Sequence, residues 1–78
     1  MGPLKTFFDY SKLRGRIREK YETEWKFAHA INRSPNYLSN VFRGKSNFSS
    51  VDIYRAAQAL DIPTDEIGLY FFTPRKIS

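Results

Sequence analysis

Residues 23–44, TEWKFAHAINRSPNYLSNVFRG, predict two short helices joined by a tight turn. Thr23 can cap the first helix, because its hydroxyl can accept a free N–H of the first turn. Asn32 lies where the chain must turn, and asparagine tolerates the left-handed backbone conformation that ends a helix sharply. Ser34 suits the cap of the second helix, and Gly44 suits its end. The local signals therefore predict a helix-turn-helix.

Apolar side chains recur with helical period in both halves of this stretch and would face inward. They are Phe27, Ala28 and Ile31 in the first helix, and Leu38, Val41 and Phe42 in the second. The other side of the second helix carries Asn36, Ser39, Asn40 and Arg43, which share one face at about 100° per residue. Asparagine can pair with adenine in the major groove, and arginine can read guanine or hold a phosphate. This face predicts a helix that reads DNA, and the alternative is an ordinary solvated surface.

Residues 23–44 resemble the helix-turn-helix of the phage lambda repressor and Cro superfamily, usually spelled T-Q-x-x-L-A-x-x-x-G-[VI]-S-x-x-x-[IL]-S-x-[IVL]-x-x-G. The positions that carry the resemblance are Thr23, Phe27, Ala28, Ser34, Leu38, Ser39, Val41 and Gly44, with Asn32 at the place of the family's glycine. A later segment, AAQALDIPTDEI, resembles the family's A-x-A-L-G-V-x-x-D-E-L. The resemblance implies an all-α, five-helix bundle with short terminal arms that binds DNA. We predict that its DNA-facing residues are Asn36, Tyr37, Ser39, Asn40, Arg43, Lys45, Glu24 and Arg33.

The chain departs from the family pattern at several positions. Glu24 replaces the usual glutamine, and a carboxylate there would repel phosphate and accept hydrogen bonds only from cytosine among the bases. Asn32 replaces the usual glycine, and Arg33 replaces a small apolar residue. Pro35 occupies a position often used for base contact but offers no donor. These departures leave the fold intact and favour, as an alternative, a protein that acts with a partner.

The composition of the chain argues against several classes of protein. The chain has 78 residues, enough for one small domain, and it has no cysteine, which excludes disulfides and thiolate metal sites. No apolar run reaches the roughly 18 residues of a membrane span, and no signal peptide is visible. His29 is the single histidine, and there is no glycine-rich phosphate loop. We therefore expect no enzyme, cofactor, small-molecule ligand or membrane partner, and a cytoplasmic location in a bacterial host.

Charge is unevenly placed along the chain. Residues 10–48 hold nine Lys or Arg against three acids, a balance of +6, whereas residues 49–73 hold one Arg against four acids, a balance of −3. This division suggests one surface for phosphates and another for a different purpose. The alternative is that the basic side chains only solubilise a helix.

The domain boundaries follow from the same pattern. Residues 1–9 form an N-terminal arm, residues 10–72 the helix-turn-helix domain, and residues 73–78 a polar tail. Phe7 and Phe8 are too apolar for a free tail, so we expect them to pack on the domain or on a partner. Asp9 or Ser11 can cap the first helix, and a short fifth helix is expected to end at Ile67.

Aromatic side chains crowd the end of the domain. The run Leu69, Tyr70, Phe71 and Phe72 has more apolar area than a domain this small is expected to cover, since each ring can bury ~150–250 Å². It is a candidate protein interface, or it closes the core within one subunit. Trp25 falls opposite the apolar stripe of its helix, so we expect it to be partly exposed, as an interface anchor or lying flat on the surface.

Two functions remain open. The first is a short phage-type transcriptional regulator of Gram-positive hosts, Cro-like, that binds double-stranded operator DNA as a dimer in a lysis/lysogeny switch. The second is a modulator or antirepressor that forms a heteromer with a phage repressor and alters its DNA binding. Glu24, Pro35, Trp25 and the aromatic C-terminus favour the second function.

Overall fold

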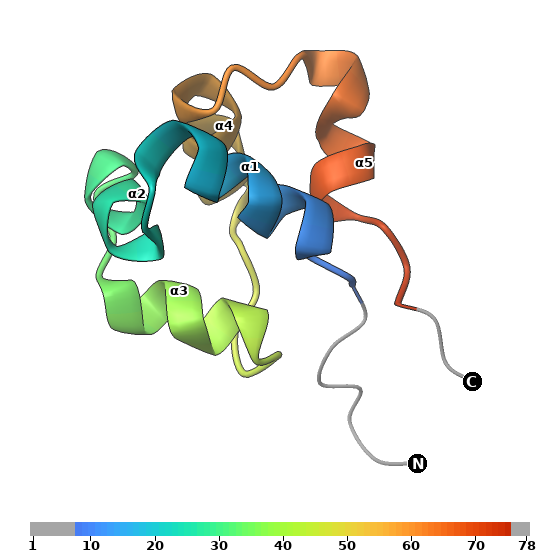
Figure 1. Cartoon of the computed structure of the whole chain (residues 1–78). Helices are drawn as coiled ribbons and strands as arrows, with labels where there is room; N and C mark the ends of the chain where they lie inside the picture. Colours follow the sequence, from blue (N-terminus) through green and yellow to red (C-terminus); the bar gives the residue numbers. More distant parts are fainter. Residues whose placement is uncertain (1–7, 76–78) are drawn as a thin grey trace, which may run out of the picture.

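The computed structural model describes residues 8–75, which form a compact arrangement of helices (Figure 1). The elements in this part of the chain are α1 (Ser11–Tyr21), α2 (Glu24–Ala30), α3 (Pro35–Phe42), α4 (Ser50–Ala59), the 3-10 turn η1 (Thr64–Glu66) and α5 (Ile67–Phe71). The predicted all-α, five-helix class is confirmed. The predictions for residues 1–7, including Phe7, and for 76–78 lie outside the described residues.

Local side-chain chemistry sets the ends of the two central helices as predicted. The hydroxyls of Thr23 and Ser34 each accept the backbone N–H three residues on, at 3.1 Å. Asn32 has φ 63° in the turn between α2 and α3, and Gly44 has φ 84° after α3. Both values lie in the left-handed region, where Asn and Gly are the residues that fit best. The predicted helix-turn-helix is therefore present.

The core gathers around α1, which lies between α2 and α5 (Figure 1). Its buried apolar side chains are Leu13, Ile17, Phe27, Ala28, Ile31, Leu38, Ala56, Ala57, Leu60, Ile62, Tyr70 and Phe71. The inward stripes predicted for α2 and α3 contribute to this core, and α1 and α4 add apolar stripes of their own. Because α3 places Leu38 and Val41 on the bundle, its opposite face stays at the surface.

The fifth helix differs from the prediction that it ends at Ile67. The turn η1 leads directly into α5, which continues to Phe71, so most of the aromatic run is helical. No proline lies between Pro63 and Phe71, and Gly68 is accommodated within α5, so the chain continues turning. Helical periodicity then divides the run, with Tyr70 and Phe71 facing the core and Leu69 exposed.

The two ends of the described chain lie side by side. Phe8 forms an isolated antiparallel bridge with Pro74, and the N–H of Asp9 donates to the carbonyl of Thr73 at 2.8 Å. The Phe8 ring meets the edge of Phe72 with 5.5 Å between centroids, so the predicted packing of Phe8 on the domain is confirmed. Asp9 accepts the Ser11 N–H at 2.8 Å from the position before the N-cap, whereas the N-cap residue itself is Tyr10, whose side chain makes no capping bond. The beginning of α1 is therefore tied to the end of α5.

Candidate nucleic-acid interface

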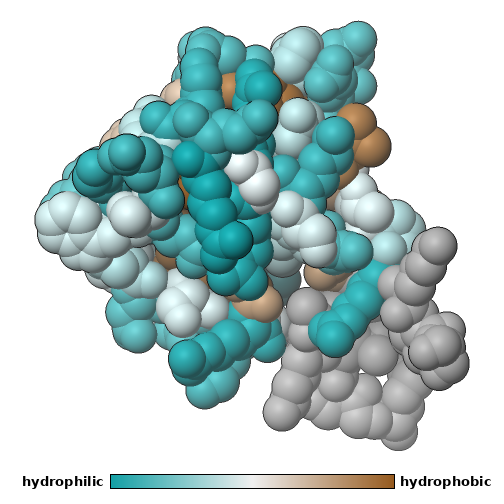
Figure 2. Space-filling model, viewed as in Figure 1, coloured by the Kyte–Doolittle hydropathy of each residue, from teal (hydrophilic) through white to brown (hydrophobic). Residues whose placement is uncertain are grey.

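The outer face of α3 carries polar side chains that have no partner among residues 8–75. Asn36 and Arg43 are exposed, and Ser39 and Asn40 are half-buried at the sides of the helix. Within residues 8–75, none of these side chains, nor that of Lys45, makes a hydrogen bond or ion pair. In the view of Figure 2, the lower edge of the molecule over α3 is hydrophilic to neutral. The donors and acceptors of this face are available to a ligand.

Most other cations of the basic half are already engaged. Arg14 pairs with Glu24 at 2.7 Å, and its guanidinium lies 4.8 Å from the centroid of the Phe42 ring. The further pairs are Arg16 with the carbonyl of Leu60, Lys20 with Asp61, and Lys26 with Glu22. Arg43 directly follows α3 and Lys45 lies two residues further on; within residues 8–75 neither makes an ion pair, in contrast to the residues above.

Glu24 was predicted to face DNA, and the structure places it against Arg14 at the start of α2. The pair joins α1 to α2, and the side chain of Glu24 is only 26% exposed. Its charge is therefore largely compensated within the domain. This pairing lowers the repulsion of phosphate that we expected from a free carboxylate at this position.

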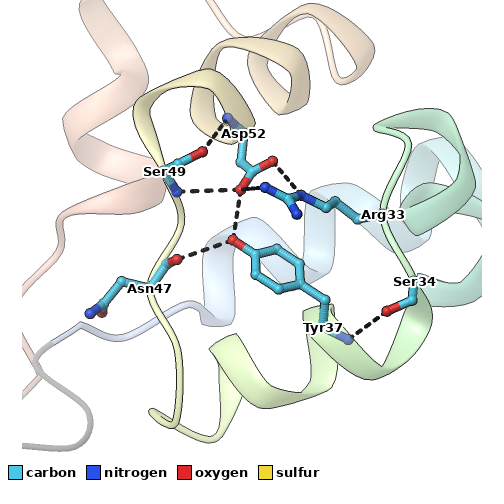
Figure 3. Close-up of polar contacts among 6 residues, drawn as sticks. All are labelled: Arg33, Ser34, Tyr37, Asn47, Ser49 and Asp52. Carbon is cyan, nitrogen blue, oxygen red and sulfur yellow. Dashed lines mark hydrogen bonds and ion pairs between the residues drawn. The ribbon is translucent and has the colours of Figure 1, made fainter.

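A buried carboxylate lies in the first turn of α4, above α3 in the view of Figure 3. Asp52 is fully buried in α4, and its two oxygens accept Arg33 Nε at 2.9 Å and Arg33 Nη2 at 3.1 Å. The Tyr37 hydroxyl lies 2.6 Å from Asp52 Oδ2 and 3.1 Å from the carbonyl of Asn47. Ser49 completes a capping box, because its hydroxyl accepts the Asp52 N–H and its own N–H donates to the carboxylate at 3.3 Å. The carboxylate thus meets four donor groups.

These contacts fix the charges in the cluster. Burial by itself would raise the pKa of Asp52, but the hydrogen bonds from Arg33, Tyr37 and Ser49 outweigh burial and lower it to about 2. Burial, together with the hydrogen bond to Asp52, raises the pKa of Tyr37 to about 12. The hydrogen bond to Asp52 also raises the pKa of Arg33. At neutral pH the carboxylate is ionised and the tyrosine is protonated.

The cluster changes the set of residues that can face DNA. Arg33 was predicted to belong to that set, but its guanidinium is directed at Asp52 and lies 4.5 Å from the centroid of the Tyr37 ring. Tyr37 is likewise turned toward α4, because its hydroxyl binds Asp52. We therefore remove both from the DNA-reading face. Sequence reasoning missed this pairing, since no local pattern links Asp52 to Arg33, nineteen residues away.

The predicted protein-interface residues divide into two groups. Trp25 is 59% exposed, as expected, and its ring meets that of His29 with 4.6 Å between centroids. Leu69 and Phe72 are also about half exposed. Tyr70 and Phe71 are buried in the core of their own subunit, which corrects the prediction that they belong to an interface.

Two kinds of site are not found in the part of the chain that the structure describes. No helix there combines the length and apolar character needed to cross a bilayer. No three His, Asp or Glu side chains within residues 8–75 lie together as a group that could hold a metal ion.

Comparisons with known proteins agree with this geometry. Residues 6–74 match the model of a family described as "Protein of unknown function (DUF739)". The chain is similar to the solution structure of the modulator of repression (MOR) of the temperate bacteriophage TP901-1 from Lactococcus lactis, with 33% identity, a TM-score of 0.75, and coverage of 86% of this chain and 90% of that one. It is also similar to the restriction-modification controller protein C.AhdI from Aeromonas hydrophila, with 32% identity, a TM-score of 0.55, and coverage of 76% and 91%. No curated protein matches the chain.

Proposed function

The chain belongs to the DUF739 family and has the helix-turn-helix fold of lambda repressor and Cro-like proteins, and on this premise we propose that it is a transcriptional regulator that binds operator DNA through α3. The similarity to a phage modulator of repression and to a restriction-modification controller supports a regulatory role. We place that role in a lysis/lysogeny switch.

The unpartnered outer face of α3 is the observation that carries the proposal. The major groove of B-DNA admits an α-helix, and the recognition helix of a helix-turn-helix uses its N-terminal part to contact base edges. On the outer face of α3, Asn36 is exposed and Asn40 is half-buried, and each can form two hydrogen bonds with adenine. Arg43 and Lys45, at the end of the helix, carry unbalanced charge suited to phosphate.

Direct reading by Asn40 is tested with a duplex from the promoter region that flanks the gene and a scrambled duplex of equal length. Asn40→Ala should reduce the ratio of the two affinities, because a bidentate base contact contributes about 1–3 kcal/mol of discrimination. Gln58→Ala removes an exposed amide from α4 and serves as the control, with an unchanged ratio. An equal effect of the two substitutions, or binding of neither duplex by the unmodified protein, would contradict the proposal.

Phosphate contacts are tested by salt titration of the same complex. Arg43→Ala should reduce the slope of log affinity against log salt concentration by about one unit, because one phosphate contact is lost. Arg55→Ala removes an exposed arginine from α4 and should leave the slope unchanged. Identical slopes for both variants and the unmodified protein would remove Arg43 from the interface.

A second function is favoured by a different observation. Trp25, Leu69 and Phe72 are large apolar side chains left about half exposed or more, and MOR is a modulator of repression. We infer as the second candidate that the chain forms a heteromer with a phage repressor and changes the DNA binding of that repressor. Addition of the protein to a phage repressor should then alter the shift that the repressor produces with its own operator.

Substitutions of the exposed apolar residues distinguish the two candidate functions. Trp25→Ala and Phe72→Ala should weaken the effect on the repressor if the surface binds that protein. If the protein acts on DNA alone, both variants should shift the promoter duplex as the unmodified protein does. An unchanged repressor shift at all concentrations of the protein would exclude the second candidate.

A further inference from the structure

The proposed DNA-reading face rests on a short helix with few apolar contacts. α3 has eight residues, and its fully buried side chains are Leu38 and Val41. Leu38 and Val41 decide which side of α3 faces the core, and Phe42 packs partly buried beside them. Apolar packing has no preferred direction, so it tolerates small rotations of the helix about its own axis more readily than a hydrogen bond does. This rotation matters, because rotating α3 about its axis redirects the side chains of Asn36 and Asn40 together.

The hydrogen bonds to Asp52 are directional and can fix the rotation of α3 about its own axis. Tyr37 lies three residues before Asn40, so their side chains are neighbours on the helix surface, and Asn36 lies four residues before Asn40 on the same face. Its hydroxyl lies 2.6 Å from the carboxylate of Asp52 in α4 (Figure 3). Hydrogen bonds require defined distances and angles, unlike apolar packing. This bond therefore sets the rotation of α3 relative to α4.

The same carboxylate holds the segments on both sides of α3. Arg33, in the turn before the helix, binds both oxygens of Asp52 (Figure 3). Ser49, in the loop after the helix, donates its N–H to Oδ2. The Tyr37 hydroxyl also lies 3.1 Å from the carbonyl of Asn47 in that loop. One buried group thus contacts the turn, the helix and the loop that together form the proposed DNA surface.

We propose that Asp52 is a positioning residue for DNA reading, which holds α3 at the rotation that presents Asn36 and Asn40 to the bases. It does so through Tyr37, while its bonds to Arg33 and Ser49 keep the ends of the helix in place. This inference rests on the proposed function, because it gives the buried cluster a purpose in that same surface. Arg33 and Tyr37 take part as supports and do not contact bases.

The main test variant is Tyr37→Phe, which removes one hydroxyl and keeps the ring against Arg33. Tyr54→Phe is the matched control, since Tyr54 lies on α4 with 64% of its surface exposed. Asp52→Asn provides the stronger perturbation, and circular dichroism shows whether each variant is folded. If Asp52→Asn does not fold, the outcome for Tyr37→Phe decides.

The first measurement requires no DNA. Residual dipolar couplings of backbone amides should show that α3 is reoriented relative to α4 in Tyr37→Phe and unchanged in Tyr54→Phe. Amides of residues 43–49 should also exchange faster with solvent in Tyr37→Phe. Unchanged couplings and exchange rates in a folded Tyr37→Phe variant would overturn the inference, whether or not the protein binds DNA.

The second measurement uses the promoter and scrambled duplexes. Tyr37→Phe should lose about tenfold in the ratio of the two affinities, a part of what a bidentate base contact provides, with the salt slope unchanged because no cation is removed. A purely structural role would lower the melting temperature and leave the ratio for the folded protein intact, which would overturn the inference. A reoriented α3 in a protein that binds neither duplex would contradict the proposed function and leave Asp52 as the residue that orients the helix.

Discussion

Phe71 and Phe72 are neighbours in the sequence, and the structure predicts very different consequences for their removal. Phe71 is 1% exposed and meets Phe48 edge to face, with 5.7 Å between ring centroids. Phe72 is 47% exposed and contacts Phe8 at the surface. Phe71→Ala and Phe72→Ala delete the same atoms, so they form a matched pair that differs only in environment.

The magnitudes follow from burial. Truncating a fully buried phenylalanine costs about 3–5 kcal/mol, because apolar burial is lost and a cavity remains. A domain of 78 residues has a total free energy of unfolding of roughly 4–12 kcal/mol at about 0.05–0.15 kcal/mol per residue. Phe71→Ala therefore removes a large share of the stability. Phe72→Ala should cost about 1 kcal/mol, since half of the ring is already in water and no internal cavity forms.

Urea unfolding at 25 °C, followed by circular dichroism, measures both variants. The midpoint should fall sharply for Phe71→Ala and slightly for Phe72→Ala, with similar slopes against urea. If Phe71→Ala is unfolded without urea, Phe71→Leu replaces it as the milder variant of the same position. Equal midpoint losses for the two alanine variants would refute the assignment of Phe71 to the core and Phe72 to the surface.

Two further predictions concern single residues of the helix-turn-helix region. The pKa of Asp52 is lowered to about 2 in the folded protein and is about 3.9 in an unfolded chain, so its contribution to stability is present above about pH 4 and is lost as pH falls toward 2. Because Arg33 is partly exposed, solvent screening reduces this contribution to about 1–2 kcal/mol. The urea midpoints of the unmodified protein and of Asp52→Asn should therefore converge as pH falls from about 4 toward 2, and a constant difference between them would contradict the prediction. Asn32→Ala should lower the free energy of unfolding by about 1 kcal/mol, because φ is 63° at this turn, whereas Asn32→Gly should be neutral or stabilising. A higher melting temperature for the alanine variant than for the glycine variant would contradict this explanation.

Residues that act on their own backbone were predictable from the sequence. Thr23 and Ser34 cap α2 and α3, and Asn32 and Gly44 adopt the left-handed conformation, all as expected. Each of these effects depends on groups within about four residues, so the local sequence contains the required information. The outward position of Trp25 was predictable for the same reason, because helical period assigns each position to a face.

The end of the domain shows where local patterns were insufficient. Leu69, Tyr70, Phe71 and Phe72 are all apolar, so composition could not separate core from surface. The buried and exposed residues of this run can be told apart only when two facts are known: α5 continues from η1, and it packs against α1. Once the helix is placed, its period directs Tyr70 and Phe71 inward and leaves Leu69 outside.

The sequence by itself determined the helices, their caps, the tight turn and the polar face of α3, because these depend on periodicity and on bonds between near neighbours. The tertiary structure alone decided which charged and aromatic side chains are free to meet a ligand. Arg14 forms an ion pair with Glu24, ten residues away, and Arg33 forms one with Asp52, nineteen residues away. Such pairs depend on how helices pack in space, and the same arginine can face DNA or a buried carboxylate according to that packing.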